Sequence, residues 1–189
     1  FPLEKHIKVS NIFSSDILQK SLQPIYNYEG KNPFLWIRHK VAKKQAKSFN
    51  KDLLKKMSGE EGLFKFNLNE RAKAWKKYIL STNPDLIITM SVGTLLEITF
   101  NNELNIPIVN SVNGRPDYDY TDILWYRSKI EMSLLEESYS KLSAIQVLFK
   151  SYKDYLPKTF LGKSQVIPNP VFQVKEDEIV VHENNKERY

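Results

Sequence analysis

The densest group of polar side chains lies at residues 110–119 (NSVNGRPDYD), directly after an apolar run. Arg115 can bind a carboxylate or a phosphate through two parallel hydrogen bonds, because its guanidinium presents its donors in a planar fork. Asn113 can bind ligand hydroxyl groups, as can the carboxylates of Asp117 and Asp119, and either carboxylate can act as a base. Residues 110–119 therefore form a candidate surface for a polar ligand.

Turn formation is the competing explanation for this loop. Asn113-Gly114 and Pro116-Asp117 are pairs that favour turns, since glycine permits positive φ and proline presets φ. In a binding loop, the same Gly114 would leave the backbone permissive. Both explanations stay open at the level of sequence.

Residues 91–94 (SVGT) form a second candidate ligand surface, because they join an apolar run to a helical pattern. The free N–H groups at a helix N-terminus, together with the hydroxyls of Ser91 and Thr94, can receive an anion or a ligand hydroxyl beside Gly93. The alternative is capping, since serine and threonine are the usual N-cap residues.

Four apolar runs predict the strands that position these loops, at residues 85–90, 106–112, 143–149 and 165–167. The first run is almost entirely apolar, which is typical of a strand covered on both faces in a parallel sheet. Helical patterns alternate with the strands, so we expect an α/β fold with an open parallel sheet covered by helices. Ligands of such sheets bind at the carboxyl ends of the strands, where both candidate loops lie.

The expected helices lie at residues 34–57, about 70–82, 95–103, 122–141 and 150–156. Asn67 or Asn69 can cap the second of them, and Asn83-Pro84 marks its end. Ser58-Gly59 is expected to end the first helix and Gly62 to keep the next few residues irregular, and residues 5–13 form a further candidate strand.

The net charge of +6 is concentrated in one region, because residues 31–77 hold 14 Lys and Arg against 4 Asp and Glu. Such a region can meet anionic lipid headgroups, nucleic acid or phosphorylated small molecules. An amphipathic basic helix with aromatic residues at its start can contact a membrane surface. The candidates for this contact are Phe34, Trp36, Lys40, Lys43, Lys44 and Lys47. Alternatively, the helix packs by its apolar face and its lysines are solvated.

Composition argues against several classes of site. The chain has no cysteine, and its histidines at positions 6, 39 and 182 share no ligand spacing, so we expect no metal site and no cofactor. No apolar run approaches the length of about 18 residues that a membrane span requires, and no signal peptide is recognisable. We therefore expect a soluble, cytoplasmic protein, peripheral on the inner face of a membrane where the basic region makes contact.

Three segments together resemble the amino-terminal, acceptor-side domain of glycosyltransferase family 4, whose members are retaining enzymes with the Rossmann-like GT-B fold. Residues 84–90 resemble its "proline, aspartate, apolar strand", and residues 106–112 its "isoleucine, proline, apolar strand". Residues 151–171 resemble its "serine, x, lysine, x, x, leucine" followed by "valine, isoleucine, proline, asparagine, proline or glycine, valine". The last motif is the most specific, because it marks the passage between the two domains of the family.

The resemblance implies a hexosyltransferase that moves a sugar from a nucleotide-sugar co-substrate to a glycan or glycolipid acceptor in cell-surface polysaccharide synthesis, without a required metal. It implies acceptor contacts for Ser91, Gly93, Thr94 and the loop at 113–117. It also implies a hinge at Pro168, Asn169 and Pro170. Asn113 stands where the family often has histidine.

The implied layout is an acceptor-side domain at residues 1–171, with a basic helical insert at 31–82 and a linker at 172–189 toward a donor-binding domain. The family's opening strand and glycine-rich loop have no counterpart, so the chain is expected to be a fragment that is inactive alone. An unpaired sheet edge then predicts self-association. The alternative function is a non-catalytic basic module that binds nucleic acid or an anionic membrane surface; no recognised nucleic-acid motif supports nucleic-acid binding.

Overall fold

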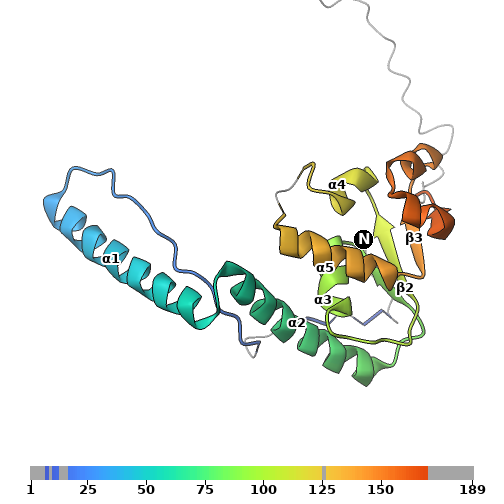
Figure 1. The fold of residues 1–189 in the computed structure, drawn as a ribbon, viewed down its shortest axis with the longest axis horizontal. Coiled ribbons are helices and arrows are strands. Elements are labelled where there is room, and N and C mark those ends of the chain that lie inside the picture. The colour runs from blue at the N-terminus through green and yellow to red at the C-terminus, as the bar shows by residue number, and fades with distance from the viewer. Residues whose placement is uncertain (1–6, 9, 13–16, 125–126, 170–189) are drawn as a thin grey trace, which may run out of the picture.

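A four-stranded, all-parallel, open sheet forms the centre of the protein in a computed structural model that describes residues 7–8, 10–12, 17–124 and 127–169 (Figure 1). The strands are β1 (Ile87–Thr89), β2 (Ile108–Val112), β3 (Ala144–Val147) and β4 (Ser164–Val166), and they are neighbours in that order. The predicted α/β class with an open parallel sheet is confirmed.

Alternation along the strands divides the sheet into two different faces. The buried face carries Ile108, Asn110 and Val112 of β2 together with Ile145 and Val147 of β3. Register aligns Asn110 with Thr89 on one side and with Ile145 on the other, so one polar residue lies in the middle of an apolar layer.

Two helices provide most of the apolar partners of the buried face. Helix α3 (Val92–Thr99) packs against helix α5 (Lys129–Ser140), and both contribute to one core with the strands (Figure 1). Leu95 of α3 and Leu135 of α5 are completely buried there. Burial of such side chains stabilises a fold by about 1.5–3 kcal/mol each relative to exposure.

The opposite face of the sheet is exposed at β1 and only partly buried at β2 and β3, within the described part of the chain. Ile88 of β1 is 60% exposed, and its neighbours Leu86 and Met90, two residues away on either side, are exposed as well. The expectation that residues 85–90 are covered on both faces is therefore wrong for the described residues. The reason is that the described helices which contact the core pack against one face only.

The chain before the sheet forms two long helices. Helix α1 (Pro33–Lys56) begins at Asn32, whose side chain accepts hydrogen bonds from the N–H groups of Phe34 and Leu35. Helix α2 (Glu60–Thr82) ends at Asn83 in the left-handed conformation, where its end was predicted.

Helix α2 begins well before the predicted start, so the irregular segment expected around Gly62 is wrong. Gly62 lies inside the first turn of α2 and against the carbonyl oxygen of Met57, where an added Cβ would come within 1.7 Å. The glycine is therefore a point of close backbone approach between two successive helices, and it does not interrupt the second one.

Residues 17–56 form an arm, which projects away from the sheet in Figure 1 with its first segment running beside α1. The side-chain amide of Asn50 on α1 accepts a hydrogen bond from the backbone N–H of Gln23 at 2.7 Å and donates one to its carbonyl at 2.9 Å. Asn67 of α2 holds both backbone groups of Lys20 in the same way, at 2.8 and 2.7 Å. Each amide satisfies a donor and an acceptor of an extended segment, as a neighbouring strand would.

The helices after β2 and β3 differ in part from the prediction. The long helix expected at about 122–141 is confirmed as α5, but it begins only at Lys129, and a separate short helix, α4 (Pro116–Tyr120), precedes it. The segment after β3 forms two 3-10 helices, η1 (Lys150–Tyr155) and η2 (Lys158–Lys163), and the predicted helix at 150–156 takes this tighter form. The candidate strand at 5–13 lies partly outside the described residues, and those described there carry no strand.

Candidate functional site at the carboxyl edge of the sheet

Both sequence-predicted loops lie at the carboxyl edge of the sheet. Residues 91–94 follow β1 and residues 113–117 follow β2, and these strands are parallel neighbours with Thr89 aligned to Asn110. The two loops therefore share one edge, as expected for ligand loops of an open parallel sheet.

Ser91 acts as the N-cap of α3. Its hydroxyl oxygen accepts a hydrogen bond from the N–H of Thr94 at 3.1 Å and lies 3.0 Å from the hydroxyl of Thr94. Gly93 is exposed beside it. The capping interpretation is thus correct for Ser91, and the exposed turn leaves room for a ligand at the same position.

Arg115 is already engaged by its own loop. Its Nε and Nη2 donate to the two carboxylate oxygens of Asp117 at 2.7 and 2.8 Å, and these hydrogen bonds raise the pKa of the guanidinium. The guanidinium carbon also lies 4.4 Å from the ring centre of Tyr118 and 4.7 Å from that of Tyr155. Arg115 therefore links the loop after β2 to η1, and its partly exposed guanidinium is fixed at the edge with its charge balanced by Asp117.

Asn113 and Gly114 are exposed at the tip of this loop. A Cβ on Gly114 would meet no atom within 4 Å, so the backbone there is open to an approaching group. Asn113, Gly114 and the Arg115–Asp117 pair together offer an amide, open backbone and a neutralised ion pair. Such a set suits an uncharged polar ligand better than a free anion, because Asp117 occupies the paired donors of Arg115.

The sequence predictions missed a series of hydrogen bonds between buried side chains beneath the loops. The side-chain amide of Asn110 donates to the hydroxyl of Thr89 at 2.8 Å, and the hydroxyl of Tyr120 donates to Oδ1 of Asn110 at 2.5 Å. Burial raises the pKa of Tyr120, which keeps its hydroxyl protonated as a donor. An asparagine in the middle of an apolar strand was the signal in the sequence that pointed to such a partner.

Asp119 is the residue before Tyr120 on α4. Burial raises the pKa of its carboxyl, and the positive charge of Arg127 opposes that effect. The carboxylate of Asp117 is engaged by Arg115 through both oxygens, so it is not free to act as a base in this arrangement.

The membrane-contact candidates lie on the arm, remote from the loops. Phe34 is 82% exposed at the start of α1, and Trp36 is half exposed with the ammonium of Lys40 at 4.7 Å from its ring centre. Lys43 donates to Asn27 at 2.5 Å, whereas Lys44 and Lys47 are exposed. Only Ala46 of α1 is buried among the residues described, so the helix does not pack by its apolar face there.

The hinge candidates follow β4. The N–H of Ile167 donates to the carbonyl of Val147 at 2.9 Å, which is the last backbone contact recorded to the sheet, and Pro168 and Asn169 are exposed after it. Pro170 and the linker at 172–189 lie outside the described residues. Among those described, no group of His, Asp and Glu is placed to hold a metal ion.

The protein therefore belongs to the class of α/β proteins that have an open parallel sheet, and it carries polar loops at the carboxyl edge of that sheet. Comparison with protein families, with curated proteins and with solved structures found no match to the chain.

Proposed function

We propose that the chain is the acceptor-side unit of a retaining glycosyltransferase of the GT-B kind. It would take a sugar from a nucleotide-sugar co-substrate and transfer it to a glycan or glycolipid of the cell surface. One observation carries the proposal. The segments that resemble glycosyltransferase family 4 fall on β1, on β2 and on the stretch from η1 to β4, in one parallel sheet and in the same order.

The acceptor contacts are assigned to Ser91, Gly93 and Thr94 after β1 and to the loop 113–117 after β2. The fixed Arg115–Asp117 pair and the exposed amide of Asn113 would bind acceptor hydroxyls. Neutral hydroxyl groups suit this surface, since each polar group there can donate or accept without needing a counter-charge. Pro168 and Asn169 would form the hinge toward the donor side.

The test is a transfer assay with the whole gene product, a panel of labelled nucleotide sugars and membrane glycolipids as acceptors. Replacing Asn113 or Arg115 by alanine is expected to lower kcat/KM about tenfold or more, the effect of losing one good hydrogen bond. Glu103→Ala is the control, because Glu103 is exposed beyond the other end of α3. The proposal would be contradicted if kcat/KM were the same in the Asn113 and Arg115 variants as in the wild type, or if no donor supported transfer. Residues 1–189 alone are expected to bind acceptor without transferring sugar.

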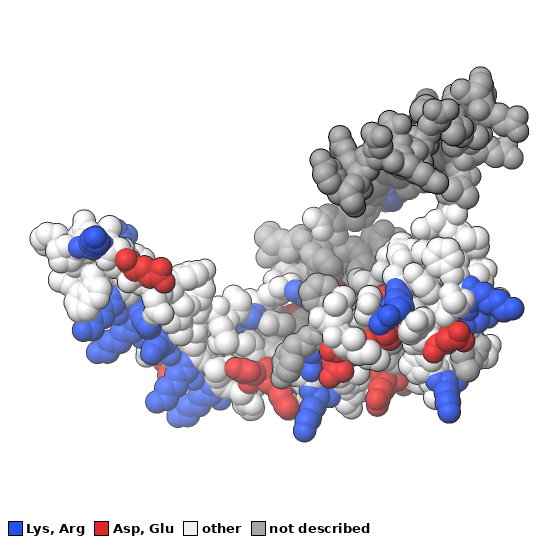
Figure 2. All heavy atoms as spheres, turned by 90° about the horizontal axis from the view of Figure 1, so that it is seen from above, with Lys and Arg blue, Asp and Glu red and all other residues white. Residues whose placement is uncertain are grey.

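A second proposal concerns the arm. We propose that it holds the protein on an anionic membrane surface, which on a cytoplasmic enzyme would be the inner face of the membrane. Residues 30–51 contain seven Lys and Arg and no Asp or Glu. Figure 2 shows these charges gathered along one side of the arm. Exposed Phe34, Trp36 and Ile37 lie at the free end of the same helix. Each Lys or Arg near anionic lipid contributes about 1 kcal/mol, and the aromatic rings suit the interface.

No helix within the described ranges is long and apolar enough to cross a membrane. Contact would therefore be peripheral, and vesicle sedimentation tests it. Binding should require anionic lipid, and should weaken when Lys40, Lys43, Lys44 and Lys47 are all replaced by glutamine. The double variant Phe34→Ser, Trp36→Ser should weaken it too, whereas Leu80→Ser, which removes an exposed side chain of α2, should not. Tight duplex binding that falls steeply with salt, without vesicle binding, would replace this proposal by the nucleic-acid alternative.

A further inference from the structure

Asn113-Gly114 is the one Asn-Gly pair in the chain. An asparagine followed by glycine is open to attack within the chain, because the backbone nitrogen of a glycine has no side chain beside it and can reach the side-chain carbonyl carbon of the asparagine. Asparagine is accordingly among the thermolabile residues of proteins. Whether such a pair reacts depends on its exposure and on the hydrogen bonds of its amide groups in the fold.

Both residues of the pair are exposed at the tip of the loop after β2. Within the described part of the chain, neither the side-chain amide of Asn113 nor the N–H of Gly114 forms a hydrogen bond. A Cβ added to Gly114 would meet no atom within 4 Å, so no neighbour restricts movement of the backbone there. The nitrogen that attacks and the carbonyl that it attacks are therefore both free in the folded protein.

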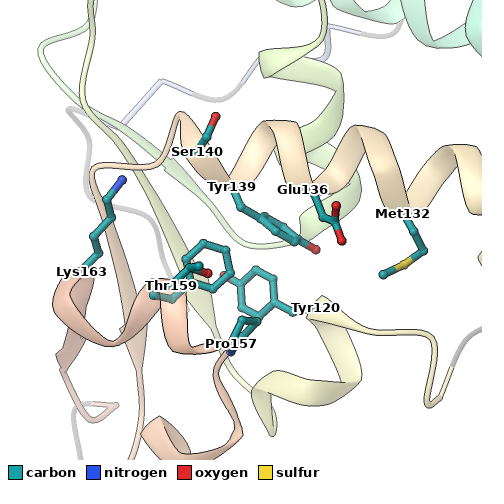
Figure 3. Close-up of a pocket in the computed structure, with 9 residues that line it drawn as sticks. Tyr120, Met132, Glu136, Tyr139, Ser140, Pro157, Thr159 and Lys163 are labelled. Carbon is teal, nitrogen blue, oxygen red and sulfur yellow. The ribbon is translucent and has the colours of Figure 1, made fainter.

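The segments on either side of the pair are held in place. Val112 is buried at the end of β2, and the guanidinium of Arg115 is bound to Asp117. Helix α4 is anchored by Tyr120, whose ring packs against that of Tyr139 with centres 4.9 Å apart (Figure 3). The pair is thus a short exposed link between anchored segments, and its reaction needs rotation about a few bonds without unfolding of the sheet.

Two nearby asparagines each meet only one of the requirements. Asn105 is exposed, but the nitrogen after it belongs to Ile106, whose branched side chain hinders attack. Asn110 precedes Ser111, which has a small side chain, but Asn110 is only 1% exposed and its amide is hydrogen-bonded to two neighbouring side chains. Asn113 combines exposure with an unhindered nitrogen.

We propose that Asn113 is a site of spontaneous deamidation in the folded protein. The backbone nitrogen of Gly114 loses its proton and forms a bond to Cγ of Asn113, while the bond from Cγ to Nδ2 breaks and the side-chain nitrogen leaves as ammonia. The product is a cyclic succinimide. Water then opens the ring at either carbonyl carbon and gives aspartate or isoaspartate, so water is the co-reactant and the net change is an amide converted to a carboxylate.

Either product changes the charge of the loop. Asp117 lies two residues after Arg115, and the new carboxylate would lie two residues before it, so it can compete with Asp117 for the guanidinium. Isoaspartate also routes the main chain through the former side chain, which lengthens the link by a methylene carbon. Both products lack the amide donor of Asn113. A loss of acceptor binding on this account rests on the proposed function, whereas the deamidation itself does not.

Incubation of the 189-residue chain in mildly alkaline buffer, followed by digestion at glutamate and mass spectrometry, tests the proposal. The fragment 104–131 contains Asn105, Asn110 and Asn113, so the three residues are compared within it. Asn113 should convert about tenfold faster or more than the other two, the ratio for a barrier lower by about 1.4 kcal/mol. Enzymatic methylation of isoaspartate should label the same residue. Conversion should slow in mildly acidic buffer, because the attacking nitrogen must lose its proton.

Gly114→Ala should slow the conversion of Asn113 about tenfold, because the added methyl group hinders the attacking nitrogen. Alanine fits this position, since Gly114 does not have a positive φ and the new Cβ would meet no atom within 4 Å. Thermal unfolding of the variant should therefore stay close to that of the wild type. Gly162→Ala is the matched control, because Gly162 is an exposed glycine with equally open surroundings, and it should leave the rate unchanged.

Equal conversion of the three asparagines, or no conversion at Asn113, would overturn the proposal. Conversion of Asn113 that occurs only in urea would overturn it as well, because it would show that the fold protects the pair. The measurement uses neither a sugar donor nor an acceptor, so its result stands even if the proposed transfer activity is absent.

Discussion

The hydroxyl of Tyr120 donates to Oδ1 of Asn110 at 2.5 Å and so ties α4 to the middle of β2. Both residues are buried, with Asn110 only 1% exposed, and the amide nitrogen of Asn110 is already bound to Thr89. The bond therefore holds the loop that carries Arg115 and Asp117 at a fixed place beside the sheet. Its loss would leave an acceptor buried without a partner.

Tyr120→Phe is accordingly expected to lower the free energy of unfolding by about 1–3 kcal/mol, the usual cost of an unsatisfied buried polar group. Tyr139→Phe is the matched comparison, because it removes an equally buried hydroxyl that has no partner in the described ranges. Urea unfolding measures both. Equal destabilisation of the two variants would contradict the importance of the Tyr120–Asn110 bond.

Asp119→Asn is expected to stabilise the protein at neutral pH. Burial raises the pKa of the Asp119 carboxyl, so the folded protein binds this proton more tightly than the unfolded chain does. The stability that the carboxyl contributes is complete below the pKa of the unfolded chain, about 3.9, and is lost as pH rises through the folded pKa. Urea unfolding between pH 3 and 7 measures the stability of both proteins. The gain in unfolding free energy of Asp119→Asn over the wild type should become smaller as the pH is lowered. An advantage that grows instead would contradict the prediction, and the exposed Asp85→Asn serves as control.

Leu135→Ala is expected to cost about 2–5 kcal/mol of unfolding free energy, because it opens a cavity at a completely buried position between α5 and the sheet. Leu80→Ala removes a leucine side chain that is mostly exposed on α2, and should cost less than about 0.5 kcal/mol beyond the small difference in helix propensity. Thermal and urea unfolding distinguish the two. Similar losses would show that α5 does not pack as described.

Asn50→Ala should release the extended segment of the arm from α1. Two hydrogen bonds to Gln23 are lost, so trypsin is expected to cut after Lys20 and Lys31 roughly fivefold faster, for about 1 kcal/mol of local stability. Gln45→Ala, an exposed change on the same helix, is the control. Unchanged cleavage at both sites would mean that the segment is held by other contacts.

Within the described residues β1 is an edge strand with an exposed apolar face, and this predicts self-association of residues 1–189. Ile88 is the exposed apolar residue at the centre of that edge strand, and a lysine there should weaken pairing between copies, as charges on natural edge strands do. Light scattering over a concentration series should show wild type larger than Ile88→Lys, and Leu80→Lys equal to wild type. A wild-type chain that stays monomeric at every concentration would contradict this.

Much of the fold followed from local patterns in the sequence. The apolar runs that became β1, β2 and β3 could be placed because each is short, apolar and followed by a polar loop. Ser91 could be placed at the start of α3 because a serine hydroxyl satisfies the free N–H groups of a helix start. The position of both candidate loops at one edge followed from the parallel order alone.

Other features depended on contacts between residues far apart in the chain. Asn110 meets Thr89 and Tyr120, and the early start of α2 depends on Gly62 fitting against Met57, which no periodic pattern expresses. The sequence by itself determined the α/β class, the succession of strands and helices along the chain and the basic helical region, because propensity and periodicity are local. Only the tertiary structure decided which sheet face is covered, that Asp117 occupies Arg115 and that the hydroxyl of Tyr139 is left without a partner. Burial and hydrogen bonding are set by what packs beside a residue in space.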